Sequence, residues 1–179
     1  HYKGTGSFKS ATQISIIDDK KKETIIDSDK IIISTGSEPI SLPGVKFDEK
    51  VIVASTGALK LQQVPKKMVV VGGGYIGLEM GSVWSRLGSN VTVIEYLDHI
   101  IPGMDREVSK EFQKILSKQG IKFLLNNKVT GIKNEKNKVF VEFSDNTSKK
   151  KENIENKISV IIPCKNEEKN IEIIKYICG

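Results

Sequence analysis

The feature that most restricts the fold is a glycine-rich turn between an apolar strand and an amphipathic helix. Residues 67–71 are predicted as a buried strand, and the turn over residues 72–77 follows at once. Residues 78–87 carry apolar side chains at helical spacing, and Gly88 ends this helix. A second strand over residues 90–95 completes a βαβ unit, which implies parallel strands and a right-handed crossover. The sequence therefore predicts an α/β fold with a Rossmann-type parallel sheet.

The glycine spacing in the turn is that of a dinucleotide-binding fingerprint. Gly72 permits the tight turn, Gly74 lets the backbone approach a pyrophosphate, and Gly77 lets the helix pack on the strand. The phosphates would meet the free N–H groups and the positive end of the helix. Glu95 closes the second strand, where its carboxylate would bind a ribose 2′-hydroxyl and repel a 2′-phosphate, and no arginine follows in residues 96–98. The pattern predicts NAD; a turn that binds nothing and a methyl-donor nucleotide site are the alternatives.

The remaining elements are predicted from apolar patterning and turn residues. Before the βαβ unit, the sequence predicts a hairpin from residues 14–17 and 24–26, a buried strand over 30–34, and a short helix opening at Ser55. After it, the sequence predicts a helix over 105–119, a strand over 121–125, a β-ribbon from 129–132 and 139–143, a polar loop over 144–157, a strand over 158–163 and a short helix over 167–177. In the helix over 105–119, one face is predicted to carry Val108, Phe112, Ile115 and Leu116.

Charge and composition exclude several classes of protein. The net charge of +6 comes almost entirely from scattered lysine runs, and aromatic residues make up only 6% of the chain. Nucleic-acid readers usually add arginine and stacking aromatics, so we expect a solvated lysine surface and no nucleic-acid partner. No run approaches the roughly 18 apolar residues of a membrane span. The two cysteines, Cys164 and Cys178, argue against a disulfide scaffold and for a reducing compartment.

Three segments around the βαβ unit closely resemble the NAD domain of the dihydrolipoamide dehydrogenases, a branch of the flavoprotein disulfide reductase family. They are residues 69–88, 91–95 and 101–108. Residues 31–39 resemble the stretch where the FAD domain of that family touches its flavin, so the likeness extends over about residues 1–143. The resemblance implies hydride transfer from dihydrolipoamide through FAD to NAD⁺. It also implies lipoamide-bearing subunits of 2-oxoacid dehydrogenase complexes as partners, and a homodimer whose interface domain this sequence lacks.

The resemblance also implies roles for individual residues. NAD would be bound by Gly72, Gly74, Tyr75, Ile76, Gly77, Glu79, Glu95 and Val129, and FAD would be approached by Thr35 and Gly36. Within the NAD set, Ile76 and Glu79 would lie in the first turn of the helix facing the nicotinamide, and Val129 would line the adenine pocket. A plainer interpretation of Glu79 is a carboxylate that favours the positive end of the helix dipole. For Trp84 we expect core packing.

Several features of that family have no counterpart here. The sequence lacks a second GxGxxG turn, a Cys-x4-Cys redox pair and a late His-Pro pair. Cys164 and Cys178 are expected to be free thiols, and His99 is expected to be incidental because it lacks an acidic partner. We therefore predict no catalytic residue and no metal site in this chain.

The end of the chain departs from the family. Residues 158–170 resemble the opening strand of nucleotide-sugar glycosyltransferases, with Pro163 followed by an Asn-Glu pair. A fused or frameshifted gene remnant and a divergent last strand of the NAD sheet both explain this tail. We predict that residues 158–162 pair in parallel beside residues 69–71.

These observations lead to an expected organisation and function. Residues 1–45 are the end of an FAD-binding domain, 46–66 a connector, 67–163 an NAD-binding Rossmann domain and 164–179 a divergent tail. The expected function is the NAD-binding part of a dihydrolipoamide dehydrogenase-like oxidoreductase, in the cytoplasm, the mitochondrial matrix or a plastid. The alternatives are a non-catalytic remnant that binds NAD weakly or not at all, and a glycosyltransferase fragment, which would need an Asp-x-Asp motif downstream of the tail strand, where this sequence has none. The first residue is not Met, which suggests a fragment.

Overall fold

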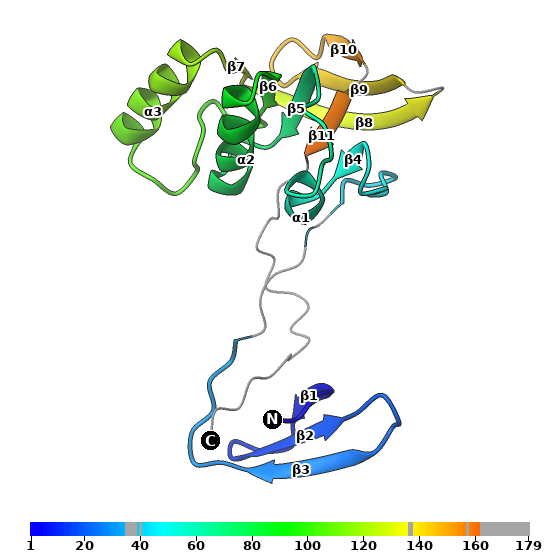
Figure 1. Cartoon of the computed structure of the whole chain (residues 1–179). Coiled ribbons are helices and arrows are strands. Elements are labelled where there is room, and N and C mark those ends of the chain that lie inside the picture. The colour runs from blue at the N-terminus through cyan, green and yellow to red at the C-terminus, as the bar shows by residue number, and fades with distance from the viewer. Residues whose placement is uncertain (35–38, 40, 136–137, 157, 162–179) are drawn as a thin grey trace. The chain divides into compact units, whose positions relative to one another are not determined.

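The computed structural model describes residues 1–34, 39, 41–135, 138–156 and 158–161, in two compact units (Figure 1). The first unit is an antiparallel sheet with strand order β1-β2-β3. Its strands are β1 Thr5–Phe8, β2 Gln13–Ile17 and β3 Glu23–Asp27. Ile14 pairs with Ile26 across β2 and β3, which confirms the predicted hairpin.

The buried strand predicted over residues 30–34 is wrong. These residues form no strand, and the side chains of Ile32 and Ile33 are 82% and 54% exposed. An apolar run becomes a strand only where a neighbouring strand accepts and donates its backbone hydrogen bonds. No strand in the described part of the chain lies beside this run.

The second unit is built on a five-stranded parallel sheet, which confirms the predicted fold class. In sheet order the strands are β4 Ile52–Val53, β11 Ile158–Ile161, β5 Lys67–Val71, β6 Asn90–Ile94 and β7 Lys122–Leu124. Every neighbouring pair is parallel. The sequence analysis did not predict β4, because a strand of two residues is too short to show an alternating pattern. Strand β4 lies at the edge of the described sheet and pairs there with β11 alone.

The predicted pairing of the tail is confirmed. Strand β11 lies between β4 and β5, with Val160 opposite Val69 on one side and opposite Ile52 on the other. Residue 162 and the helix predicted over 167–177 lie outside the described residues.

Two helices, α2 (Tyr75–Arg86) and α3 (Arg106–Lys118), cover one face of the parallel sheet. Both ends of α3 and the C-terminal end of α2 follow the predicted signals, whereas α2 begins at Tyr75, three residues before the predicted start. Helix α2 is followed by Gly88 at a φ of +106°, a backbone conformation that favours glycine. Helix α3 begins at the side chain of Asp105, whose carboxylate accepts hydrogen bonds from the N–H groups of Glu107 and Val108. A short helix, α1 (Ser55–Ala58), forms where the sequence predicted one.

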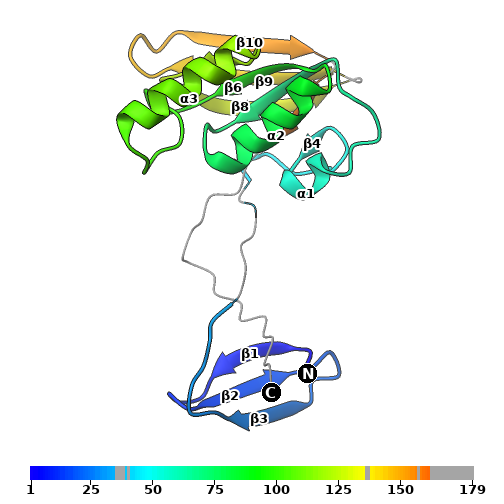
Figure 2. The ribbon, with the colours of Figure 1, turned by 60° about the vertical axis from the view of Figure 1, so that its left-hand side comes forward.

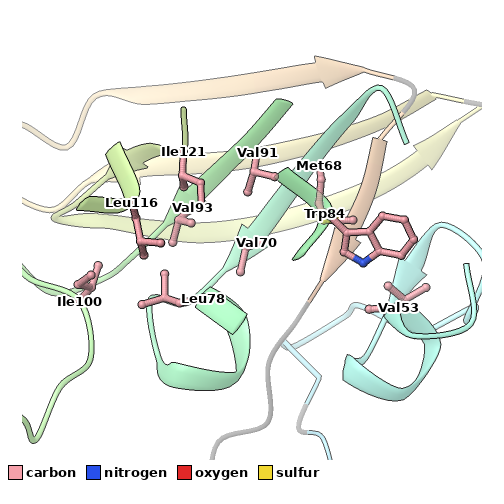
Figure 3. Packing of buried hydrophobic residues seen from close by; sticks show 11 residues of the cluster. Val53, Met68, Val70, Leu78, Trp84, Val91, Val93, Ile100, Leu116 and Ile121 are labelled. Atoms are coloured by element: carbon pink, nitrogen blue, oxygen red, sulfur yellow. The ribbon is translucent and has the colours of Figure 1, made fainter. Parts of the chain in front are cut away.

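The side chains of β5 alternate between two cores, which explains why this strand is apolar from Met68 to Val71. Met68 and Val70 pack on the helix side, and Val69 packs on the opposite side. The helix-side core, drawn in Figure 3, includes Leu78 and Trp84 from α2, so the expected core position of Trp84 is confirmed.

The predicted apolar face of α3 is partly wrong. Leu116 is buried and Phe112 packs against the helix-side core, but Val108 and Ile115 are 49% and 44% exposed. The buried face instead includes Ser109, whose hydroxyl donates to the carbonyl of Ile100 at 2.7 Å. A polar residue is tolerated there because its hydrogen bond is satisfied.

An antiparallel sheet of β10-β9-β8 covers the other face of the parallel sheet (Figure 2). Its strands are β8 Asn127–Glu135, β9 Lys138–Asp145 and β10 Lys151–Asn156. The predicted ribbon is therefore confirmed, but the polar loop predicted over 144–157 is wrong where β10 forms. Strand β10 pairs with β9 from Lys151 to Asn156, so backbone pairing makes a strand of a polar segment with one apolar residue, Ile154.

Among the described residues, no helix combines the length and the apolar character that crossing a bilayer requires.

Candidate functional site

The glycine-rich turn lies at the carboxyl end of β5, where the chain reverses into α2. Gly72 has a φ of +103°, and its N–H donates to the carbonyl of Ile94 at 2.8 Å, which ties the turn to the neighbouring strand β6. Gly74 is the N-cap of α2 and supplies no capping side chain. The first helical hydrogen bond runs from the N–H of Leu78 to the carbonyl of Gly74. The amides of the first turn therefore have no partner within the helix, and they suit an anion.

The space beside Gly74 is open. A Cβ built on this residue would meet no other atom within 4 Å, and the φ of −75° is one that any residue adopts. The turn is different at Gly73, where a Cβ would lie 3.0 Å from Cγ2 of Ile100 and 3.3 Å from Oε2 of Glu95. A flat molecule or a phosphate can therefore approach the backbone at Gly74 but not at Gly73.

Glu95 holds the turn from the neighbouring strand. Its side chain is buried, and its two carboxylate oxygens accept different backbone N–H groups. Oε2 accepts from Gly73 at 2.5 Å, and Oε1 accepts from Leu97 at 2.8 Å. Each carboxylate oxygen has a second lone pair, so Glu95 keeps the capacity to accept a hydroxyl.

The next peptide group, between Gly73 and Gly74, is held as well. The carbonyl of Gly73 accepts from the N–H of Ile101 at 2.7 Å, in the loop that follows β6. That loop is anchored in turn by fully buried Ile100, whose carbonyl accepts the hydroxyl of Ser109. The glycine turn is thus fixed from two directions before any ligand arrives.

The other residues predicted to bind NAD differ in how far their side chains are exposed to solvent. Tyr75 is 65% exposed and Ile76 is half-buried, both in the first turn of α2. Glu79 is exposed and is the fifth residue of α2, so its predicted place in the first turn is wrong, and the first turn holds no acidic residue. The helix-dipole interpretation of Glu79 loses its basis, because that effect falls off beyond the first turn.

Val129 and Gly77 are buried. Val129 lies on β8 in the same core cluster as Ile94, the last residue of β6 before Glu95. Gly77 lies in the first turn of α2. Thr35, Gly36 and both cysteines fall outside the described residues.

His99 has an acidic partner, contrary to expectation. Its Nδ1 lies 2.7 Å from Oδ1 of Asp98, and the same oxygen accepts from Nη1 of Arg106 at 3.0 Å. The hydrogen bonds from His99 and Arg106 lower the pKa of the Asp98 carboxyl. Sequence reasoning treated His99 as unpartnered because it did not consider its direct neighbour, and because Arg106 reaches Asp98 only through the fold of the loop.

The reasoning from sequence also missed a hydrogen-bond network around Glu95. The carbonyl of Glu95 accepts from Asn127 and the carbonyl of Leu97 accepts from Asn126, both at 2.9 Å. Asn146, in the turn between β9 and β10, donates to Tyr96 and Asn126. Asn146 lies in a polar segment 50 residues after Tyr96, and no sequence pattern indicates that the two are in contact.

A cavity of about 340 Å³ lies elsewhere, at the amino ends of the parallel strands. Its lining includes Lys67, Asn90 and Lys122, each the first residue of its strand, and Ile154 of β10. The glycine turn is at the opposite, carboxyl ends of these strands, so the cavity is not part of the candidate nucleotide site. Within the described part of the chain, no group of three or more His, Cys, Asp or Glu residues is placed to hold a metal ion.

Comparison of the sequence with known proteins gives a consistent result. Residues 2–162 match the family model described as pyridine nucleotide-disulphide oxidoreductase. The chain is 54% identical over 132 residues to a mitochondrial dihydrolipoyl dehydrogenase of Pisum sativum and 55% identical over 132 residues to a leghemoglobin reductase of Vigna unguiculata. These alignments cover 74% of this chain but 26% and 25% of the relatives, so the chain spans about a quarter of their length.

Solved structures show the same fold. A Cu(II) complex of the HOCl-induced flavoprotein disulfide reductase of Escherichia coli superposes with a TM-score of 0.75 at 25% identity, covering 95% of this chain and 37% of that one. A protein of Mycobacterium tuberculosis, at 20% identity and a TM-score of 0.72, covers 89% of this chain and 34% of that one and supports the fold alone. With a family model that matches residues 2–162, this chain belongs to the pyridine nucleotide-disulphide oxidoreductases.

Proposed function

We propose that this chain binds NAD(H) at the turn formed by residues 72–77, as the NAD-binding part of a dihydrolipoamide dehydrogenase-like flavoprotein. The observation that carries the proposal is the pair of hydrogen bonds that hold Gly73 between Glu95 and Ile101. They keep the open side of Gly74 and the free amides of α2 in position for a pyrophosphate. A preorganised site of this kind loses little entropy on binding.

The residues present fit the dinucleotide. The amides of the first turn of α2 would take the pyrophosphate, and the free lone pairs of Glu95 would take the adenosine ribose hydroxyl. Tyr75 and Ile76, at the start of α2, are left for the nicotinamide half. When bound, the nicotinamide supplies the hydride acceptor, and the role of this chain is to hold and orient it.

The family chemistry needs parts that lie beyond these residues. A disulfide, a flavin and a base act together in the parent reaction, and we assign none of them to a residue of this chain. FAD binding, lipoamide-bearing partners and a homodimer are proposed for the parent protein only. Because several relatives are named as mitochondrial, the mitochondrial matrix is the proposed compartment of the parent protein.

The second candidate function is a remnant that binds NAD weakly or not at all. It is favoured by the exposed side chains of Ile32 and Ile33, which have no strand to pair with among the described residues. Titration of the chain with NADH, followed by nicotinamide fluorescence, decides between the two functions. Saturable binding supports the first, and no binding at millimolar NADH supports the second.

A substitution at Gly74 tests whether the turn is the binding site. Gly74→Ala fits the fold, since the added methyl group meets no atom within 4 Å, yet this group would occupy the space that the pyrophosphate needs. We expect at least about a tenfold weaker affinity for NADH, which corresponds to about 1.4 kcal/mol.

Gly81→Ala is the matched control on the same helix. Its Cβ would lie 3.4 Å from Val91 and 3.5 Å from Val70, which are ordinary contacts. This variant should bind NADH as the parent chain does. Equal affinity of the Gly74→Ala variant and the parent chain would place the site elsewhere.

A further inference from the structure

We propose that Asn146 is a positioning residue that acts on the ribose-binding carboxylate through the peptide group between Tyr96 and Leu97. The proposal rests on the proposed function, because it assigns Asn146 to the same nucleotide site. Asn146 lies 51 positions after Glu95, in a segment for which the sequence suggested only a polar loop.

The side chain of Asn146 reaches across to the loop after β6. Its Nδ2 donates to the carbonyl of Tyr96 at 2.7 Å. Its backbone N–H donates to the carbonyl of Asn126, also at 2.7 Å. The residue therefore joins the turn between β9 and β10 to the segments that follow β6 and β7.

The turn that carries Asn146 is itself well fixed. Oδ1 of Asp145 accepts from the N–H groups of Thr147 at 2.9 Å and Ser148 at 2.6 Å. The backbone of Asp145 exchanges hydrogen bonds with Lys149 and Lys150 at 3.0 and 3.1 Å. Asn146 thus donates from a fixed support.

A single planar peptide group links Asn146 to Glu95. The carbonyl of Tyr96 and the N–H of Leu97 belong to the same peptide unit, which is rigid and trans. Asn146 holds its oxygen end, and Oε1 of Glu95 holds its N–H end. Rotation of this peptide breaks both hydrogen bonds together. Asn146 therefore opposes any rotation that would release one oxygen of the Glu95 carboxylate.

The consequence concerns the ribose and not the phosphates. With the peptide fixed, Glu95 presents its remaining lone pairs in one orientation. Without Asn146, the oxygen end of this peptide loses its side-chain donor, so the hydrogen bond from Leu97 to Oε1 of Glu95 breaks more readily and the carboxylate gains freedom to turn. Binding of a 2′-hydroxyl should weaken, while binding of the pyrophosphate at α2 should change little.

The test compares ADP with 2′-deoxy-ADP, which lacks the hydroxyl that Glu95 would bind. In the parent chain, ADP should bind more tightly than 2′-deoxy-ADP. In Asn146→Ala and Asn146→Asp the ratio of the two Kd values should fall about threefold to tenfold, the effect expected for one hydrogen bond. A merely structural role would weaken both ligands equally and leave the ratio unchanged, and that result would overturn the proposal.

Asn134→Ala is the control, because its amide donates to Asp48 on another part of the unit. Its ratio of Kd values should equal that of the parent chain.

A measurement on the chain without nucleotide tests the role of Asn146 separately from the proposed function. By NMR, the amide of Leu97 should exchange faster with solvent in Asn146→Ala than in the parent chain. Unchanged exchange would overturn the role of Asn146 even if the chain binds no nucleotide, whereas faster exchange with no nucleotide binding would contradict only the proposed function.

Discussion

Glu95 accepts a hydrogen bond from the backbone N–H of Gly73 at 2.5 Å, across 22 positions of sequence. The carboxylate that we propose for the ribose therefore also shapes the turn that we propose for the phosphates. The two halves of the candidate site share one side chain, so a change at Glu95 acts on both. The N–H groups of Gly73 and Leu97 satisfy the Glu95 carboxylate, which allows an acidic side chain to be buried here.

Replacing Glu95 should reduce stability as well as binding. In Glu95→Gln the amide keeps one acceptor but turns an N–H₂ group toward Gly73 or Leu97, which leaves a backbone donor unsatisfied. We expect the free energy of unfolding to fall by about 1–3 kcal/mol, measured by urea denaturation. Glu79→Gln, at an exposed position of α2, is the control and should be close to neutral. An unchanged urea midpoint for Glu95→Gln would contradict the role of Glu95 in holding the turn.

The chain should prefer NAD(H) to NADP(H). A 2′-phosphate placed at Glu95 would bring two negative groups together at a buried carboxylate, and no arginine lies in residues 96–98. We expect at least about a tenfold difference in affinity, as one unfavourable charge contact gives. Calorimetric titration with both coenzymes measures this difference, and equal affinities would refute the assignment of Glu95.

The ion pairs of Asp98 should make stability depend on pH in the acid range. The pKa of Asp98 is lowered in the folded chain, first by the hydrogen bond from His99 and then by that from Arg106. Its contribution is therefore present above the pKa of the unfolded chain, about 3.9, and is lost as the pH falls through the lower folded value. The difference in urea midpoint between the parent chain and Asp98→Asn should shrink as the pH falls from about 5 to below about 4. A difference that grows over this range would contradict this assignment.

Asn126 should tolerate glycine better than alanine. It has a φ of +57°, and both its N–H and its carbonyl are hydrogen-bonded, so the backbone cannot relax without breaking the network around Leu97. We expect Asn126→Ala to cost about 1–2 kcal/mol and Asn126→Gly to cost less, as left-handed backbone favours glycine. Thermal unfolding of the two variants gives the comparison. If both variants lose the same stability, the cost lies in the lost side chain and not in the backbone.

The polypeptide of 179 residues should oxidise no dihydrolipoamide. Its sequence has no Cys-x4-Cys pair, and its one GxGxxG turn is the one proposed for NAD. Groups that act as a unit in catalysis are not additive, so the loss of each removes most of the rate. The purified chain should be colourless and should form no NADH from dihydrolipoamide. A yellow preparation with turnover, free of host enzyme, would contradict this prediction.

The sequence determined the local elements and the identity of the turn. The βαβ unit, the C-terminal end of α2, the ends of α3, the hairpin of β2 and β3 and the apolar character of β11 all follow from patterns that span a few residues. An apolar run buried on both faces, a glycine at positive φ and an aspartate at a helix start each act through nearby atoms. Such features can be interpreted without knowing what lies across the fold.

Only the tertiary structure decided which segments met. Strand β10 is polar and forms because β9 pairs with it, whereas the apolar residues 30–34 form no strand and have no strand beside them in the described part of the chain. The buried side of α3 was settled by what packs on it, so Ser109 is inside and Val108 is outside. Asp98 contacts Arg106, and Asn146 contacts Tyr96. Neither contact could be predicted from the residues that surround these positions in the sequence. Hydrogen bonds between distant segments depend on where the backbone places donor and acceptor, and only the folded chain sets those positions.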